Sequence, residues 1–261
     1  MCSPFRLPIF GENDIMQSIV LNYITEDDVS LNSCLYLPND ENTDVENLPA
    51  VLLFPEWWGL TEHIKDKAKA LAKAGYVALA VDMYGNGRVT SDAQIASERM
   101  NELLQHPDLL SERVQLAYNN LRAVAEVNPN KMAALGFCFG GRVALDMARD
   151  GVDLCGVVSF HGMLNTQTPA QKGVVKAEIL VEHGQLDSMC TLQNVDEFRT
   201  EMDAADVKYH IDVFPDTKHG FTNPQATENG KRNGADLAYN PVVAEQAWNN
   251  ALAFLTRVLK A

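Results

Sequence analysis

The sequence has few cysteines, and their spacing does not mark a disulfide framework or a zinc site. Its 261 residues include five cysteines, an odd number, and none of them forms a Cys-x-x-Cys pair. Small extracellular scaffolds depend on paired cysteines, whereas cytosolic proteins keep their thiols reduced. We therefore expect a cytoplasmic protein without disulfides or bound metal.

Long apolar runs and clusters of basic residues are also lacking. No segment approaches the length of a membrane span, and the first residues, MCSPFRLPIFGENDIM, show no basic segment followed by an apolar stretch. The net charge of −14 repels phosphate backbones and anionic lipids. We expect no nucleic-acid or membrane partner, and a chain that acts as a monomer or a weak homodimer on a small molecule.

The composition that is present is that of a packed protein. The hydrophobic fraction is 46% and the charged fraction is 21%, both near the averages of globular domains. The length suits one sizeable core better than two small ones. We predict a single domain over residues 1–261, with residues 1–15 as a flexible N-terminal extension.

The pattern along the chain predicts a mainly parallel sheet. Residues 18–37 alternate around an acidic centre and indicate an antiparallel hairpin. Short apolar strands then alternate with helices, which requires a parallel sheet covered on both faces. The expected strands lie near 50–54, 76–82, 131–137, 154–160, 177–184 and 208–215, with helices near 62–75, 109–127, after 141, 194–205 and 242–259.

One corner of this pattern carries chemistry. The segment GFCFG, residues 136–140, places Cys138 between two glycines directly after a predicted strand and before a predicted helix. A strand that turns straight into a helix strains its corner residue, and glycines two positions away relieve the crowding. The helix amino terminus favours the thiolate. Cys138 is therefore a candidate nucleophile, and the alternative is a small buried core thiol.

Two later loops supply candidate partners. Asp187 and His219 each follow a strand, and parallel strands end at one edge of a sheet. The order nucleophile, acid, base is that of the α/β-hydrolases. Asp216 is the rival acid, but it lies in the same loop as His219 and suits a turn. His161 also follows a strand and is the rival base, which chain order disfavours.

The motifs PEWWGL, DMYG, GFCFGG, GQLD and KHGF together resemble the dienelactone hydrolase family, from about residue 22 to the last helix. This resemblance implies an α/β-hydrolase fold and a Cys-His-Asp triad, with Glu56 interacting with the thiol. It also implies an oxyanion hole formed by the backbone N–H groups of Trp57 and Phe139. The residues expected to line the substrate site are Trp58, Tyr84, Arg88, His161, Phe221 and Asn223.

The sequence departs from the better-known members of that family in its arginines. Those enzymes hold the substrate carboxylate with one arginine after the tyrosine that matches Tyr84 and another after the triad histidine. Here those regions carry Asn86 and Asn223, and Arg88 alone lies nearby. An amide does not replace a bidentate guanidinium. Together with the acidic chain, this favours a neutral ester, lactone or thioester at least as much as an anionic lactone.

We therefore expect a hydrolase that cleaves a small ester, a lactone of the carboxymethylenebutenolide type or a thioester through an acyl-Cys138 intermediate, without a metal or organic cofactor. Two alternatives stay open. One is a non-catalytic α/β-hydrolase fold that binds a small molecule. The other is an acyltransferase or thioesterase with the same triad. The segments 84–95 and 222–241, rich in Gly, Asn and Thr, are the expected walls of the site.

Overall fold

The computed structural model describes residues 18–38 and 46–260, so the expected N-terminal extension, residues 1–15, lies outside the described residues. Eight strands form one sheet in the described part of the chain, in the order β1-β2-β4-β3-β5-β6-β7-β8. The strands are β1 Ile19–Ile24, β2 Ser30–Tyr36, β3 Leu48–Phe54, β4 Val77–Ala80, β5 Val127–Phe137, β6 Gly156–Phe160, β7 Glu178–Gly184 and β8 Tyr209–Phe214. The helices are α1 Glu62–Lys73, α2 Ala93–Gln105, α3 Pro107–Arg122, α4 Phe139–Arg149, α5 Leu192–Ala204, α6 Ala226–Asn233 and α7 Pro241–Leu259.

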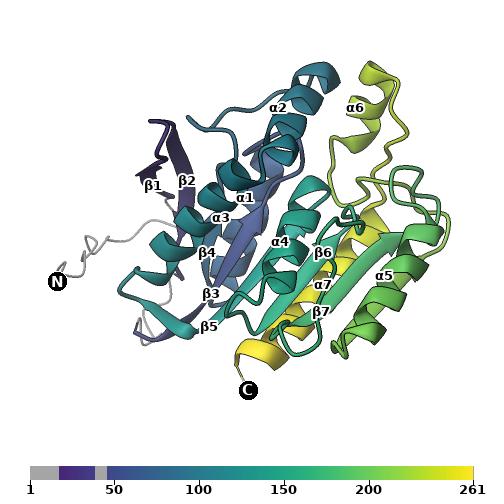
Figure 1. Ribbon diagram of the computed structural model, residues 1–261. Helices are drawn as coiled ribbons and strands as arrows, with labels where there is room; N and C mark the ends of the chain where they lie inside the picture. Colours follow the sequence, from purple (N-terminus) through teal and green to yellow (C-terminus); the bar gives the residue numbers. More distant parts are fainter. Residues whose placement is uncertain (1–17, 39–45, 261) are drawn as a thin grey trace.

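The strand directions confirm the predicted fold class. β1 and β2 form the expected antiparallel hairpin, and β2 also runs antiparallel to β4. Every other pairing, from β4 through β3, β5, β6 and β7 to β8, is parallel. The sheet is therefore mainly parallel, and the carboxyl ends of six strands meet at one edge (Figure 1).

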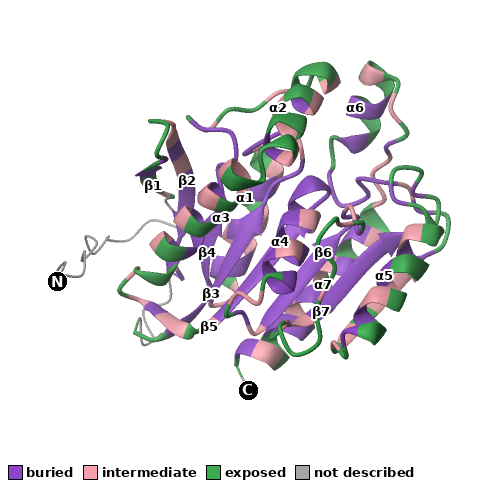
Figure 2. Ribbon diagram, viewed as in Figure 1, coloured by how far each residue is buried: buried purple, intermediate pink, exposed green. Residues whose placement is uncertain are grey.

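Helices cover both faces of the sheet because the central strands are apolar on both sides. Leu52 and Phe54 of β3 pack into one core with residues of α3, α4 and α5, whereas Val51 and Leu53 pack into the other with residues of α1 and α7. All seven residues of β3 are buried. Figure 2 shows the same burial along the neighbouring central strands, whereas exposed residues lie on the outer sides of the helices, in loops and on the edge strand β1.

The two expected wall segments contain more helix than the sequence pattern predicts. Residues 84–95 lead into α2, whose first turn is capped by the Asp92 carboxylate, which accepts hydrogen bonds from the N–H groups of Gln94 and Ile95. Residues 222–241 contain α6, a helix with few apolar residues. Asn233 at its end accepts from the Ala93 N–H and donates to the Ser91 carbonyl, so tertiary contact with the start of α2 stabilises α6.

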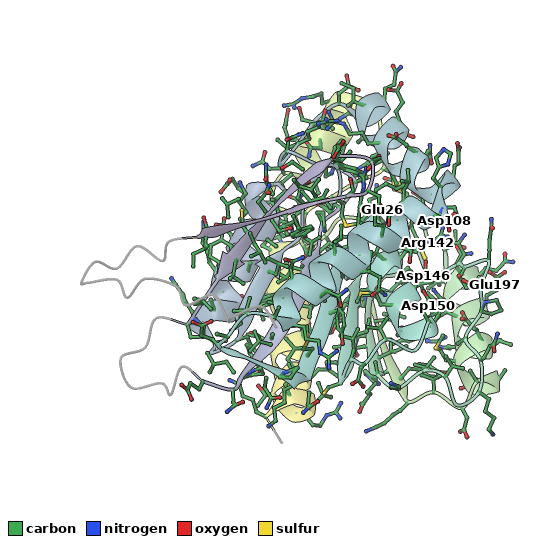
Figure 3. All side chains as sticks on the ribbon, turned by 60° about the vertical axis from the view of Figure 1, so that its left-hand side comes forward. Glu26, Asp108, Arg142, Asp146, Asp150 and Glu197 are labelled. Atoms are coloured by element: carbon green, nitrogen blue, oxygen red, sulfur yellow. The ribbon has the colours of Figure 1, made fainter. Side chains whose placement is uncertain are left out.

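Several acidic side chains lie over α3, α4 and α5. Figure 3 labels Glu26, Asp108, Asp146, Asp150 and Glu197 on this side, with Arg142 among them. Arg142 donates to Asp146 over 3.2 Å, and the same carboxylate accepts from Arg149 over 2.9 Å. Arg149 is buried and also pairs with Glu201 of α5, which joins the two helices. One buried cation thus holds α4, the helix that begins at Cys138, against its neighbour.

A carboxyl group lies buried on the opposite face. Glu182 of β7 is fully buried and lies in register with Phe160 of β6 and Asp212 of β8. Burial, together with the charge of Asp212, raises its pKa to about 9, against a smaller opposing effect from the Asn250 amide of α7. Glu182 is therefore protonated in the folded protein at neutral pH.

This proton makes stability depend on pH. Between about pH 4.5, where an unfolded glutamate ionises, and about pH 9, the folded chain holds a proton that the unfolded chain has lost. The free energy of unfolding should therefore fall as pH rises through this window. Glu182→Gln cannot titrate, so its stability relative to the parent should increase with pH. Urea denaturation of both proteins near the two ends of the window measures the difference, and a constant difference would contradict the assignment.

Candidate active site

The corner at Cys138 has the strained conformation that the sequence predicts. Cys138 ends β5 and begins α4 with φ 54° and ψ −115°, in a region that non-glycine residues rarely adopt. Its N–H donates to the Phe160 carbonyl of β6 over 3.0 Å, and its carbonyl accepts from Gly141 over 3.0 Å. The side chain is 9% exposed at the carboxyl edge of the sheet. The backbone around it is thus fixed on both sides.

Three glycines allow this corner because the backbone comes too close for a side chain. A Cβ at Gly136 would collide with the Gly140 carbonyl, and one at Gly140 would collide with the Phe54 carbonyl at the end of β3. A Cβ at Gly141 would meet the Ser159 hydroxyl of β6 at 2.6 Å. Close packing of α4 on three strands therefore requires glycine at these positions.

Asp187 and His219 meet as the sequence predicts, from the loops after β7 and β8. The Asp187 Oδ2 atom and the His219 Nδ1 atom lie 2.7 Å apart, with both side chains almost fully buried. The other Asp187 oxygen accepts from the N–H groups of Met189 and Cys190, over 2.9 and 2.8 Å. Three hydrogen bonds thus fix the carboxylate, and it in turn holds one nitrogen of the imidazole.

The charge of Cys138 acts on His219. Burial alone would lower the pKa of His219, but the negative charge of the Cys138 thiolate and the hydrogen bond to Asp187 outweigh burial and raise it well above its usual range. The Nε2 atom of His219 is buried and has no hydrogen-bond partner among residues 18–38 and 46–260. The raised pKa favours the imidazolium form of His219 while Cys138 is ionised, and Nε2 remains available to a reacting group.

Glu56 lies in the same group, after β3. It is 3% exposed, and its Oε2 atom accepts a short hydrogen bond from the Asn223 amide of the His219 loop. Burial raises the pKa of Glu56 to about 7, although the Asn223 bond and the positive charge of His219 hold it lower than burial alone would. Asn223, expected to line the substrate site, is thus the partner of Glu56, and at neutral pH this carboxyl group is near its titration midpoint.

Two backbone N–H groups have the positions expected of an oxyanion hole. Phe139 is the first residue of α4, so its N–H has no partner within the helix. No hydrogen bond engages the Trp57 N–H in the described ranges, although the next turn is closed by Gly59 donating to the Glu56 carbonyl. The Gly140 N–H donates to Pro55, which holds the two loops together. The Phe139 N–H follows the Cys138 corner directly, and the Trp57 N–H lies in the loop after β3.

The expected lining residues lie around this group, with one difference. Trp58 and Tyr84 are buried, and the Tyr84 ring stacks on Phe139 with centroids 6.5 Å apart. Trp57 packs on Trp58 at 4.8 Å, and the loop after β4 runs beside them through the Gly59–Val89 bridge. Arg88 lies exposed on that loop. Aromatic rings therefore pack beside the Cys138 corner, on the loops after β3 and β4.

His161, the rival base, is turned away from that role. Its Nε2 atom lies 2.7 Å from the Thr222 hydroxyl, and its ring packs edge-on against both His219 and Phe221, with centroids 5.1 Å apart in each case. Asp82 anchors the loop after β4, because it accepts hydrogen bonds from the N–H groups of Asn32, Tyr84, Gly85 and Gly87. Asp216, the rival acid, adopts a positive φ in the turn before His219.

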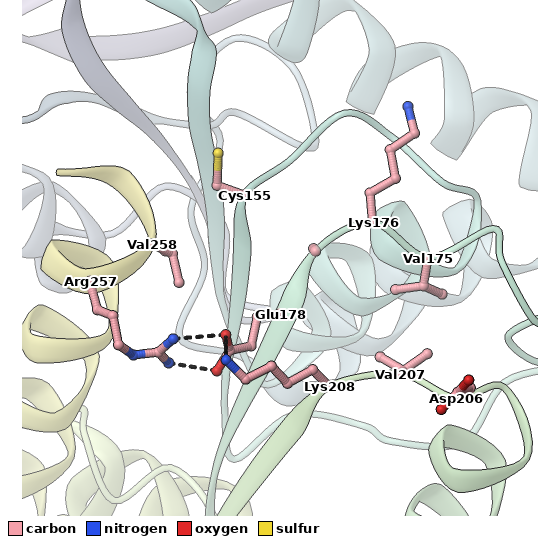
Figure 4. A pocket seen from close by; sticks show the side chains of 10 residues that line it. Cys155, Val175, Lys176, Glu178, Asp206, Val207, Lys208, Arg257 and Val258 are labelled. Atoms are coloured by element: carbon pink, nitrogen blue, oxygen red, sulfur yellow. Dashed lines mark hydrogen bonds and ion pairs between the residues drawn. The ribbon is translucent and has the colours of Figure 1, made fainter. Parts of the chain in front are cut away.

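A second hollow lies at the opposite edge of the sheet, where β6, β7 and β8 begin (Figure 4). Glu178 lies there between Arg257, which binds it through two nitrogens at 2.6 and 2.8 Å, and Lys208 at 2.7 Å. The Cys155 thiol donates to the Asn130 carbonyl. Glu178 is ion-paired on both sides, and no histidine is among the described residues that line the hollow with the thiol, so the hollow does not compete as a catalytic centre.

Other kinds of site receive no support from the described residues. They contain no cluster of three or more histidine, cysteine, aspartate or glutamate side chains that could hold a metal ion. None of their helices is both long and apolar enough to cross a bilayer.

Sequence reasoning did not find two residues of this region, His63 and Thr222. The Thr222 hydroxyl contacts His161, and it also lies 3.4 Å from the His63 Nε2 atom of α1. The only signal for Thr222 was its place between two expected lining residues, Phe221 and Asn223, and nothing in its residue type suggested a role. His63 is 159 residues away along the chain, so no spacing pattern could connect them.

The sequence is similar to that of known proteins. The model of the dienelactone hydrolase family matches residues 34–259. A Bradyrhizobium protein provisionally named a 2-oxo-3-(5-oxofuran-2-ylidene)propanoate lactonase is 30% identical over 222 residues, covering 80% of this chain and 83% of the relative. An Escherichia coli O157:H7 protein provisionally named a carboxymethylenebutenolidase is 28% identical over 218 residues, covering 78% and 75%.

Solved structures agree with the sequence comparisons. The crystal structure of a dienelactone hydrolase-like promiscuous phosphotriesterase from metagenomic libraries superposes with a TM-score of 0.83 at 29% identity. The match covers 93% of this chain and 98% of that one. An esterase from Thermogutta terrifontis, with 17% identity and a TM-score of 0.64, shares the fold.

The Asn223–Glu56 contact makes a testable prediction. The Asn223 bond lowers the pKa of Glu56, so Asn223→Ala should raise that pKa above about 7. If Glu56 acts in catalysis, the inflection near that pH in the profile of kcat/KM should move to higher pH in Asn223→Ala and disappear in Glu56→Gln. Asn130→Ala, at an exposed asparagine, serves as the control. Profiles that coincide in the parent and in Asn223→Ala would contradict the assignment.

Proposed function

Since the chain belongs to the dienelactone hydrolase family and is a carboxylic ester hydrolase, we propose that it cleaves a small ester or lactone through an acyl-enzyme on Cys138. The observation that carries this proposal is the placing of Cys138, His219 and Asp187 at one edge of the sheet, with the Asp187–His219 hydrogen bond at 2.7 Å. Cys138 occupies the strained corner, and the histidine faces it with a free nitrogen.

The proposed reaction has two halves. The Cys138 thiolate attacks the carbonyl carbon and forms a C–S bond, while the N–H groups of Trp57 and Phe139 bind the oxyanion. The C–O bond then breaks, and the leaving oxygen takes the proton from the His219 imidazolium. In the second half His219 accepts a proton from water as the water attacks the thioester, and Cys138 leaves as the thiolate. Asp187 keeps His219 in the required orientation throughout.

Glu56 would act before the first half. Its pKa of about 7 lets it exchange a proton near neutral pH, so it can accept the thiol proton of Cys138 when substrate displaces its present contacts. Asn223 supports this carboxyl group from the His219 loop. Because the amide is uncharged, it stabilises the Glu56 carboxylate less than an arginine would, so the ionisation of Glu56 remains sensitive to the arrival of substrate.

The residues near Cys138 indicate the class of substrate. Tyr84 and Phe139 lie in the same core cluster as Cys138, Trp57 packs against that cluster, and Asn223 is engaged with Glu56 instead of facing a ligand. Arg88 is exposed, and a single exposed cation is a weak clamp for a carboxylate. We therefore propose an uncharged small ester, lactone or thioester. Some relatives are provisionally named for lactones, and one solved relative is a promiscuous phosphotriesterase. Lactones and phosphotriesters therefore both belong in an activity panel.

An acyltransferase or thioesterase with the same triad is the second candidate, because the acyl-thiol intermediate is common to all three reactions. Acyl transfer is favoured where the deacylating water is excluded, and the nucleophile here is 9% exposed. Product analysis with and without a competing thiol acceptor separates hydrolysis from transfer.

The triad makes a testable prediction with an uncharged p-nitrophenyl ester, an enol lactone and an acyl thioester as substrates. Cys138→Ala should abolish turnover of whichever substrate the parent accepts. Asp187→Asn should lower kcat by about 10⁴-fold, because the imidazole loses the partner that fixes its tautomer. Asp236→Asn is the matched control, since Asp236 pairs with Lys218 on the surface. Full turnover by Cys138→Ala would refute the acyl-enzyme, and a parent protein that turns over none of these substrates would leave ligand binding as the alternative.

A further inference from the structure

One side chain that the proposed mechanism does not use lies against its base. His161 is fully buried directly after β6, and its φ is 37°, a conformation that is strained for a histidine. Its N–H donates to the Glu182 carbonyl of β7 over 2.8 Å, which fixes the backbone. A glycine would adopt this backbone without strain. The position of the imidazole ring therefore explains why a histidine stands here.

The ring of His161 lies between the base and a hydroxyl. It packs edge-on against the His219 ring, with centroids 5.1 Å apart and an angle of 64° between the planes. On its other side Nε2 lies 2.7 Å from the Thr222 hydroxyl. The Phe221 ring closes a third side at 5.1 Å. The His161 ring therefore cannot turn without moving the contacts that hold it.

Thr222 extends the chain to a third histidine. Its hydroxyl oxygen lies 3.4 Å from the His63 Nε2 atom, and the His63 ring rests edge-on against Phe137 of β5, 5.3 Å away. A hydroxyl has one proton, so Thr222 can donate to one imidazole while it accepts from the other. The row His63, Thr222, His161 can thus be joined by two hydrogen bonds, and it ends against the ring of His219.

The row remains uncharged. Burial lowers the pKa of His161 well below its usual range, and any positive charge on the neighbouring His219, His63 or His183 would lower it further. Burial, helped by Lys67, lowers the pKa of His63 to about 3. These groups come from α1, from β7 and from the loop after β8. A neutral His161 does not oppose the positive charge that His219 carries beside the thiolate.

We propose that His161 is a positioning residue for the reaction, held by Thr222, and that its ring sets the plane of His219 so that Nε2 points at Cys138. Asp187 binds only Nδ1, and one hydrogen bond leaves a ring free to swing about that contact. The edge of His161 supplies the second constraint. This inference rests on the proposed function, because it assigns a task to a neighbour of its base.

Thr222→Val tests the proposal because it preserves the shape and removes the hydroxyl. Freed from Thr222, the His161 ring should shift, and kcat should fall by about 10-fold to 100-fold, with KM changed by less than about threefold. Alkylation of Cys138 by iodoacetamide at neutral pH should slow by at least about 5-fold, because a misplaced imidazolium stabilises less thiolate. Thr222→Ser retains the hydroxyl and should restore both rates.

Thr217→Val is the matched control. Thr217 is a buried threonine of the same loop, and its hydroxyl donates to the Pro215 carbonyl without contact to His161. It should lose stability to a similar degree and retain kcat and the alkylation rate. His161→Phe is the second variant if Thr222→Val does not fold: it keeps a ring against His219, loses the bond to Thr222, and should change both rates in the same direction.

The outcomes separate this inference from the proposed function. Equal kcat and alkylation rates in Thr222→Val and Thr217→Val would overturn the positioning role while ester turnover by the parent leaves the function intact. If the parent turns over no ester, or if Cys138→Ala retains full activity, the proposed function fails. The alkylation rates of Cys138 need no substrate and still decide whether the row of side chains orients His219.

Discussion

The structure depends on one tight corner, where β5 turns directly into α4 at Cys138. The corner exists because Gly136, Gly140 and Gly141 let the backbones of α4, β3 and β6 come closer than any side chain would allow. The strained φ of Cys138 then places the thiol above the sheet edge. Without this close approach, the nucleophile would lie inside the core with the apolar residues around it.

The parallel sheet gathers the rest of the site at the same edge. Glu56 follows β3, Asp187 follows β7 and His219 follows β8, so parallel order alone brings residues far apart in sequence within reach of the thiol. Their surroundings then shift their protonation: burial raises the pKa of Glu56 to about 7, whereas a charge on Cys138 and the bond to Asp187 outweigh burial and raise the pKa of His219. The fold therefore brings these side chains together, and their surroundings set their pKa values.

The sequence predicted the sheet, the corner and the triad residues because each has a local signal: alternating apolar strands, glycines two positions from a cysteine, and polar residues just past strand ends. It did not predict α6, whose residues are mostly polar and whose stability comes from Asn233 at the start of α2. It assigned Asn223 to the substrate, whereas the fold pairs it with Glu56, 167 residues away. Such contacts depend on how the chain folds, and the spacing of residues along the sequence does not reveal them.

The most direct test of the account is mass spectrometry of the protein, digested after a rapid acid quench during turnover of a small p-nitrophenyl ester. The account predicts a mass increase of one acyl group on the peptide that contains Cys138, formed at the rate of the first half-reaction and lost as product appears. An acyl group on another peptide would contradict it. So would an initial burst of p-nitrophenol release with no acyl group on Cys138.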